Sequence, residues 1–166
     1  MDDFSARFAA ALGDYLPDIA ARLRPEAEGL FATLPSPSGR GTLRIETESD
    51  SVIIHFEPWW HGHYDENERL EWACEQDREL LGKPFGCTIQ LLREFLADRA
   101  VIMYCTRGGR WANSGTHHIW HDRDLRRCQI DYDHYEYLSW SGSEDSSPVA
   151  VDRETGDPCA CGHGAC

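Results

Sequence analysis

The sequence is short of lysine and of positive charge. Its 166 residues include a single lysine, Lys83, and 16 basic side chains stand against 29 acidic ones, which gives a formal net charge of -13. Contacts to the phosphates of nucleic acids or of anionic lipids need clustered Lys and Arg. The charge therefore argues against both kinds of partner.

Long apolar runs and a secretion signal are also missing. No stretch approaches the roughly 18 apolar residues of a membrane-spanning helix. The first residues, Met1-Asp2-Asp3-Phe4, are acidic where a signal peptide would be basic. The sequence therefore predicts a soluble, cytoplasmic protein.

The motifs of common catalytic sites are absent from the sequence. It contains no His-Glu-x-x-His, no Gly-x-Ser-x-Gly, no phosphate-binding loop and no dinucleotide-binding fingerprint. Gly108-Gly109 lacks the lysine and the following helix that a phosphate cradle requires. Enzymatic activity is left uncertain, and the motifs lean against it.

A disulfide framework is not expected either, because the seven cysteines are odd in number and no export signal accompanies them. Four of them are scattered singly through the body of the chain, where they are predicted to act as small buried hydrophobes. These are Cys74, Cys87, Cys105 and Cys128.

Apolar spacing predicts the elements of the first half. Residues 2–23 repeat apolar side chains every three or four positions, which indicates an amphipathic helix that Pro17 must kink or divide. Pro25 and then Pro35-Ser36-Pro37-Ser38-Gly39 end the helical region, and this stretch predicts a connecting loop. From Thr42 the period becomes two, which indicates a hairpin whose second strand is stopped by Pro58.

The second half is predicted to hold two helices and then three strands. The helices cover residues 65–81 and a segment that begins at Thr88 as N-cap. The strands cover residues 100–105, a segment from Trp111 and part of 125–140, with a Gly108-Gly109 turn between the first two.

This order predicts the α+β class, with an antiparallel sheet of about five strands and helices packed on one face. One domain is expected over residues 1–141, because a chain of this length usually builds one hydrophobic core. From Ser141 onward apolar periodicity disappears, which predicts a flexible, acidic, Cys-containing tail over residues 142–166.

The negative charge is concentrated in two segments. Residues 65–98 hold nine acids against four bases, and the tail holds five acids against one base. On the predicted helix, carboxylates at steps of three or four share a face with Trp72. That face is either an ordinary solvated surface or a docking face for a basic protein, in which carboxylates steer association and the aromatic ring anchors it. The carboxylates belong to Glu68, Glu71, Glu75 and Glu79.

A run of aromatic and histidine side chains lies before this helix, from Trp59 to Asp65. One interpretation is structural, with tryptophans covering the sheet. A second is a partner-binding surface beside the acidic helix. Its residues would be Trp59, Trp60, His61, His63, Asp65, Glu68, Glu71, Trp72 and Glu75.

A third interpretation is a metal site. His-x-His on a strand puts both imidazoles on one side, where they could join later histidines around an ion. Glu57 or Asp65 would then supply the base of a metal-dependent hydrolase. The histidines concerned are His61, His63, His117, His118 and His121.

The tail carries Pro158-Cys159-x-Cys161-Gly162-x-Gly164, which resembles the opening of the SEC-C zinc motif, a short module at the ends of many bacterial proteins. The resemblance implies a structural zinc site or an adaptor role, with Cys159, Cys161, His163 and Cys166 as ligands. The basic spacer and the second ligand pair of that family are missing, so a degenerate motif is the alternative.

Two further motifs resemble small immunity-like proteins of bacterial polymorphic toxin systems: the run Trp60, His61, His63, Tyr64, Asp65, and the Gly-Gly-Arg-Trp turn of residues 108–111. The resemblance implies a toxin as partner. Many antibacterial toxins are basic nucleases, which a carboxylate-rich surface can cover. The preferred hypothesis is therefore an immunity-type protein that binds and neutralises a basic toxin. A metal-dependent hydrolase or metal-binding protein and a tail-based adaptor are the alternatives.

Overall fold

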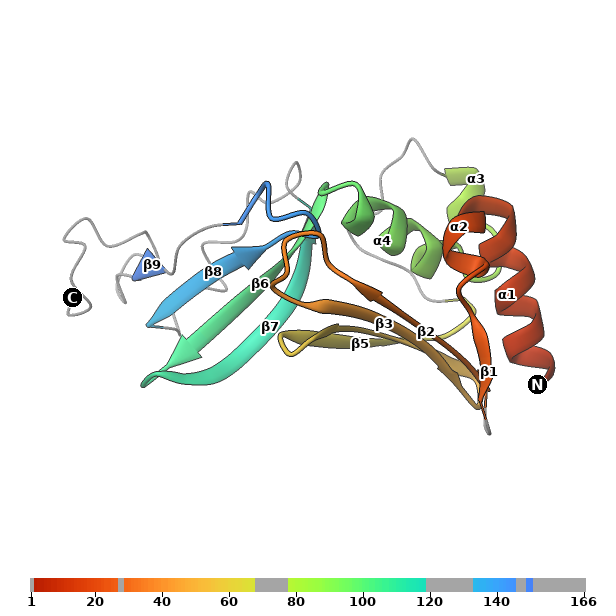
Figure 1. Cartoon of the computed structure of the whole chain (residues 1–166), viewed down its shortest axis with the longest axis horizontal. Helices are drawn as coiled ribbons and strands as arrows, with labels where there is room; N and C mark the ends of the chain where they lie inside the picture. The colour runs from red at the N-terminus through yellow and green to blue at the C-terminus, as the bar shows by residue number, and fades with distance from the viewer. Residues whose placement is uncertain (1, 27–28, 68–77, 119–132, 146–148, 151–166) are drawn as a thin grey trace. The chain divides into compact units, whose positions relative to one another are not determined.

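The computed structural model describes residues 2–26, 29–67, 78–118, 133–145 and 149–150 (Figure 1). The chain divides into two compact units, Met1–Glu94 and Phe95–Cys166. Both units contain antiparallel sheet, and the helices lie mainly in the first, so the predicted α+β class is confirmed. Among the residues described, no helix has the length and apolar character to span a membrane.

The first unit begins with two helices, α1 (Asp3–Tyr15) and α2 (Pro17–Ala20). The Asp2 carboxylate caps α1 by accepting the Ser5 N–H at 2.7 Å, which satisfies one of the free amides at the helix start. Pro17 occupies the first turn of α2, where its missing N–H costs nothing, so the proline divides the predicted helix in two. The apolar stripe is buried as expected, through Phe4, Phe8 and Leu12.

A five-stranded antiparallel sheet follows, with its strands in chain order. The loop predicted at Pro35-Ser36-Pro37-Ser38-Gly39 is present from Ser36 onward, but the segment before it, where no strand was predicted, forms β1 and β2. Leu30, Ala32 and Leu34 alternate into the core, while the two prolines, Pro25 and Pro35, lie in an edge strand and at a strand end, where a missing N–H is tolerated. The strands are β1 (Arg24–Glu26), β2 (Gly29–Pro35), β3 (Thr42–Glu48), β4 (Ser51–Glu57) and β5 (Trp60–Tyr64).

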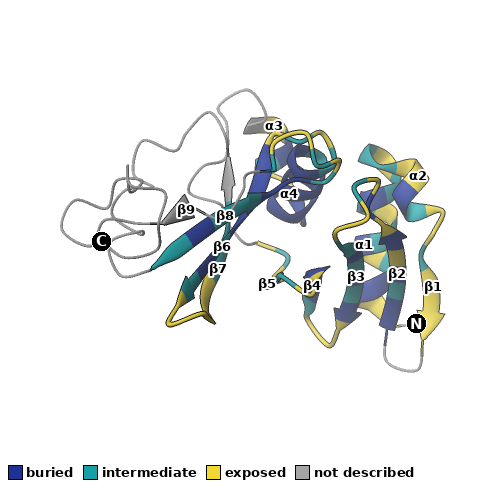
Figure 2. Ribbon diagram, turned by 60° about the vertical axis from the view of Figure 1, so that its left-hand side comes forward, coloured by how far each residue is buried: buried dark blue, intermediate teal, exposed yellow. Residues whose placement is uncertain are grey.

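One face of this sheet is packed and the other is polar. Buried and partly exposed residues alternate along β3 (Figure 2), with Leu43 and Ile45 fully buried. Along β4, Phe56 is also fully buried on the packed side, but Ile53 is buried on the opposite side as well. Helix α1 lies against the packed face, where the Ser5 hydroxyl is 2.6 Å from the Thr47 hydroxyl. The prediction of an α+β arrangement with a five-stranded antiparallel sheet is therefore confirmed. Only the predicted hairpin of residues 42–57 belongs to this sheet, and the strands predicted later in the chain form a second one.

Two more helices complete the unit, α3 (Arg78–Leu81) and α4 (Gly86–Leu96). Between them, buried Phe85 packs edge-on against Phe4 and Phe8, with ring centroids 5.1 and 5.4 Å away. Thr88, expected as an N-cap, lies inside α4 instead. Of the helix predicted for residues 65–81, residues 65–67 form a turn, 78–81 are helical and 68–77 lie outside the described part of the chain.

The second unit is a four-stranded antiparallel sheet in the order β7-β6-β8-β9. The Gly108-Gly109 turn between β6 and β7 is confirmed, and both glycines have positive φ, as a tight hairpin turn requires. Trp111, just after this turn, is 61% exposed. The strands are β6 (Ala100–Arg107), β7 (Arg110–His118), β8 (His134–Leu138) and β9 (Val149–Ala150).

Two of the four body cysteines can be assessed. Cys87 and Cys105 are buried, as predicted. Cys74 and Cys128 lie outside the described residues. Apart from residues 142–145 and the short strand β9, the tail also lies outside them.

Candidate functional site

The side of the first sheet opposite the packed face carries the polar side chains of its strands, and we call it the polar face. The strand register aligns Thr33, Arg44, His55 and His61 in one row across β2 to β5. The neighbouring row is formed by Phe31, Glu46, Ile53 and His63. A sheet that buries only one side presents alternate residues in this way.

The side chains of the predicted aromatic and histidine run lie on both faces of the sheet, because β5 alternates them. His61 and His63 share the polar face, as the His-x-His spacing predicts, and both are exposed. Trp60 and Tyr64 take the packed face, with ring centroids 6.5 Å apart and only Gly62 between them. The two histidines and Trp60 therefore do not form one surface.

The residues at the two ends of this run, Trp59 and Asp65, form hydrogen bonds between their side chains and nearby backbone groups. Trp59 precedes β5, and its indole N–H donates to the Arg40 carbonyl at 2.9 Å. The Arg40 guanidinium also lies 5.8 Å from the centre of that ring. Exposed Asp65 accepts the Asn67 N–H at 2.6 Å, which closes a turn. These contacts give Trp59 and Asp65 structural roles at the two ends of β5.

The structure adds His55 to the polar face, a residue that the sequence reasoning did not single out. It lies opposite His61 in the register, with ring centroids 5.7 Å apart, and the His61 and His63 rings are also 5.7 Å apart. The signal was present in the sequence, because His55 falls on the polar side of the alternation between Ile54 and Phe56.

Glu46 connects two basic side chains of this face. One carboxylate oxygen is 2.8 Å from His55 Nε2, and the other accepts from Arg44 at 2.5 Å. Partial burial raises the pKa of Glu46, but the hydrogen bonds from His55 and Arg44 outweigh it, so the net pKa is lowered. The hydrogen bond to Glu46 raises the pKa of Arg44, and Glu57, 3.5 Å away, adds a smaller contribution. The same guanidinium lies 5.2 Å from the Phe31 ring centre. Glu46 is thus an ionised, fixed carboxylate.

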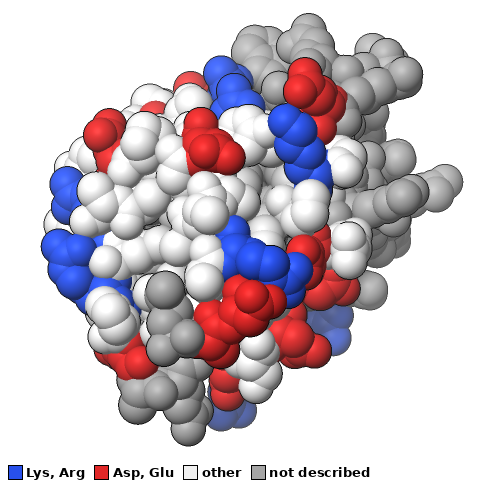
Figure 3. Space-filling model, turned by 90° about the vertical axis from the view of Figure 1, so that its right-hand side faces the viewer, with Lys and Arg blue, Asp and Glu red and all other residues white. Residues whose placement is uncertain are grey.

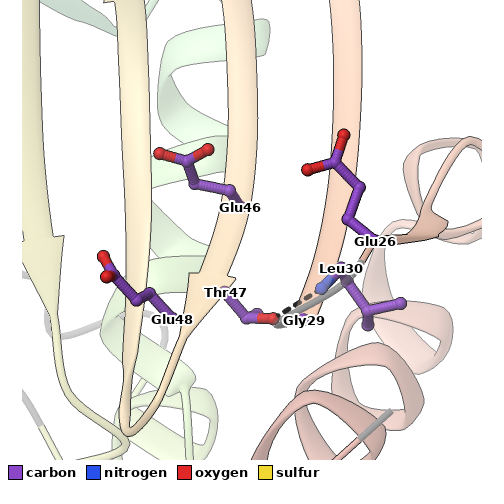
Figure 4. Close-up of a pocket in the computed structure, with 6 residues that line it drawn as sticks. All are labelled: Glu26, Gly29, Leu30, Glu46, Thr47 and Glu48. Carbon is purple, nitrogen blue, oxygen red and sulfur yellow. Dashed lines mark hydrogen bonds between the residues drawn. The ribbon is translucent and has the colours of Figure 1, made fainter.

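A hollow of about 160 Å³ lies at the start of β2, and we call it the acidic hollow. Figure 4 shows the carboxylates of Glu46 and Glu48 on β3 and that of Glu26 on β1, with Gly29 between the strands. Gly29 lets β2 approach β3 closely here, because a Cβ atom at this position would meet the Thr47 carbonyl oxygen at 2.1 Å. The adjacent Thr47 points away, and its hydroxyl accepts the Leu30 N–H at 2.8 Å. Sequence reasoning missed this site because it assigned no strand to this segment.

Three more carboxylates among the described residues of the first unit are paired with basic side chains. Arg7 contacts Asp3 at 3.1 Å and Glu66 at 2.5 Å, and Lys83 contacts Glu79 at 3.2 Å. The pKa values of Arg7 and Lys83 are raised, the first mainly by its hydrogen bond to Glu66 and the second mainly by its hydrogen bond to Tyr15. In the view of Figure 3, red and blue side chains lie interspersed. A docking site for a basic partner therefore has to be local.

Several predicted site residues lie outside the described part of the chain. They are Glu68, Glu71, Trp72 and Glu75 of the acidic helix, His121 of the later histidine group, and Cys159, Cys161, His163 and Cys166 of the tail. His117 and His118 belong to β7 in the second unit. Among the residues described, no three His, Cys, Asp or Glu side chains are already gathered to hold a metal ion.

Comparison with known proteins adds no relative. The chain matches no protein-family model, no curated protein and no solved structure. The resemblances to immunity-like proteins and to the SEC-C motif therefore stay predictions, and the argument for function depends on the polar face and the acidic hollow.

Proposed function

We propose that this chain is an immunity-type protein of the cytoplasm that binds and neutralises a basic protein toxin. The observation that supports the proposal is the acidic hollow, which Glu26, Glu46 and Glu48 line together. Because Glu46 is already bonded to Arg44 and His55, Glu26 and Glu48 are the carboxylates that a lysine or arginine side chain of a partner would meet there. Glu26 and Glu48 are exposed, so an approaching protein can reach them.

Electrostatics explains why such a site suits an inhibitor of a basic enzyme. Complementary charge accelerates encounter and selects partners, and a few anchored side chains supply most of the affinity. The net charge of -13 extends the attraction beyond the contact itself. The acidic helix predicted around Glu68, Glu71 and Glu75 would add to the same field.

The experiment is growth rescue with the toxin encoded beside this gene, followed by titration calorimetry on the purified pair. The double variant Glu26→Lys, Glu48→Lys is expected to lose rescue and to weaken binding by about a hundredfold, since reversed charges opposite basic groups cost several kcal/mol. Raising the salt concentration should slow association of the parent protein more than that of the variant.

The matched control is Asp14→Lys, Asp18→Lys, which changes the net charge by the same amount on exposed positions of α1 and α2. This control should retain rescue and most of the affinity. Equal losses in the two double variants would show that only net charge matters. If Glu26→Lys, Glu48→Lys keeps both rescue and affinity, the hollow is refuted as the docking site.

A further inference from the structure

The three imidazoles of the polar face form a cluster that the proposed partner binding does not use. His55 and His61 are directly opposed on β4 and β5, and His63 is the next residue on the same side of β5. Opposed residues of an antiparallel pair have Cβ atoms about 5 Å apart, and diagonal neighbours remain within reach of long side chains. We propose that His55, His61 and His63 form a binding site for a zinc-class divalent metal ion.

The spacing of the rings fits a shared ion. Zinc binds imidazole nitrogen at roughly 2.0–2.1 Å in tetrahedral geometry, so two rings on one ion have centres about 5 Å apart. The two observed separations of 5.7 Å lie within about an ångström of that value. The His55–His61 pair and the His61–His63 pair therefore already lie close to the ring spacing of two ligands on one ion.

Closing the site requires the side chains to rotate toward a common point. The rings do not converge on one point as they lie, in keeping with the lack of a gathered ligand group among the described residues. His61 and His63 are exposed, and exposed side chains change rotamer within nanoseconds at small energetic cost. Metal ligation supplies far more free energy than that reorientation needs.

Glu46 gives the cluster another feature of metal sites, a carboxylate that orients a histidine ligand. Histidine ligands usually donate their other ring N–H to a carboxylate, which fixes the tautomer and the ring orientation. Glu46 lies 2.8 Å from Nε2 of His55, and the two side chains are 21% and 22% exposed. With Nε2–H held by Glu46, Nδ1 of His55 carries the free lone pair for the ion. Glu46 acts here as a positioning residue and not as a ligand.

The test is zinc titration of the full chain, followed by calorimetry. Cys159, Cys161 and Cys166 are replaced by Ser, and His163 by Ala, so that the tail offers no ligands. This parent should bind one zinc ion. His61→Asn and His63→Asn should each weaken binding about tenfold or more, and Glu46→Gln should do so within about 10–100-fold, as loss of an outer-shell partner does. Cobalt bound to the parent should give the strong visible absorption of tetrahedral coordination.

The matched control is His134→Asn, which removes a partly exposed strand histidine in the second unit and should leave zinc affinity unchanged. Circular dichroism and urea midpoints confirm that each variant is folded. The proposal is overturned if the parent binds no zinc, or if the double variant His61→Asn, His63→Asn binds it as well as the parent. Unchanged affinity in Glu46→Gln would overturn the positioning role of that carboxylate.

Discussion

The close approach of Gly29 to β3 makes a sharp test of the fold around the acidic hollow. A Cβ atom at Gly29 would lie 2.1 Å from the Thr47 carbonyl oxygen and 2.6 Å from its hydroxyl oxygen. Carbon and oxygen in contact are normally about 3.3 Å apart or more. Gly29→Ala therefore forces β2 and β3 to separate by about an ångström.

The loss of stability in Gly29→Ala comes from the contacts of Thr47 that this separation breaks. The Thr47 hydroxyl accepts the Leu30 N–H at 2.8 Å and lies 2.6 Å from the Ser5 hydroxyl, both in buried surroundings. Overpacking costs about 1–3 kcal/mol, and a buried donor left without its acceptor costs about 1–3 kcal/mol more. The free energy of unfolding should fall by about 2–6 kcal/mol.

The matched control is Gly13→Ala in α1, where nothing lies within 4 Å of the new methyl group. Alanine in a helix should raise the free energy of unfolding by about 0.5–1 kcal/mol. Urea unfolding measures both variants, and hydrogen exchange in peptides from β2 and β3 assigns the loss to the first unit. A Gly29→Ala protein within about 0.5 kcal/mol of the parent, the range of ordinary surface changes, would refute the reasoning.

Three further predictions concern the same unit. Thr47→Val keeps the shape but removes the hydroxyl, so unfolding should cost about 1–3 kcal/mol less, whereas Thr47→Ser should stay close to the parent in urea unfolding. Phe85→Ala removes a ring that is 1% exposed and should lower the free energy of unfolding by about 3–5 kcal/mol. Phe31→Ala on the polar face should lower it by clearly less. The lowered pKa of Glu46 means that its stabilising charge is present above the ordinary glutamate value of about 4.3 and is lost as the pH falls through the folded pKa. The parent should therefore lose more thermal stability than Glu46→Gln between about pH 5 and pH 3, and parallel melting curves across that range would contradict this.

The sequence predicted the elements with the clearest periodicity. The stripe of Phe4, Phe8 and Leu12 predicted α1, and the alternation around Ile45 and Ile54 predicted the β3–β4 hairpin. Gly108-Gly109 predicted the second hairpin turn for a steric reason, since both glycines need positive φ. In these segments local preference and tertiary packing agree.

Four strands, β1, β2, β5 and β9, escaped prediction, and β2 and β5 did so because their signals conflict. β2 alternates Leu30, Ala32 and Leu34 toward the core, but Gly29 and Pro35 bound it with residues typical of loops. β5 follows Pro58 after a single intervening residue, so a proline that ends one strand concealed the start of the next. A short strand next to a proline is recognised only when its neighbours in the sheet are known.

The candidate sites show the same limit. His61 and His63 share a face because alternation is local, and the sequence predicted that much. Their pairing with His55 depends on the register of β5 against β4, and the acidic hollow depends on the return of β1 beside β2. Register and strand order are long-range properties, which are set by packing rather than by neighbouring residues.

Glu46 borders the acidic hollow and also orients His55, so substitution of Glu46 alone cannot separate partner binding from metal binding. Glu26 and Glu48 line only the hollow, and His61 and His63 belong only to the imidazole cluster. If the two functions are independent, the double variant Glu26→Lys, Glu48→Lys should abolish toxin binding and leave zinc affinity unchanged. The double variant His61→Asn, His63→Asn should abolish zinc binding and leave toxin affinity unchanged. If occupation of the metal site instead pulls His55 away from Glu46, zinc should strengthen binding of a basic partner, because the carboxylate is freed toward the hollow. Titration of the partner with and without zinc distinguishes these cases, and reciprocity requires the partner to raise zinc affinity by the same factor.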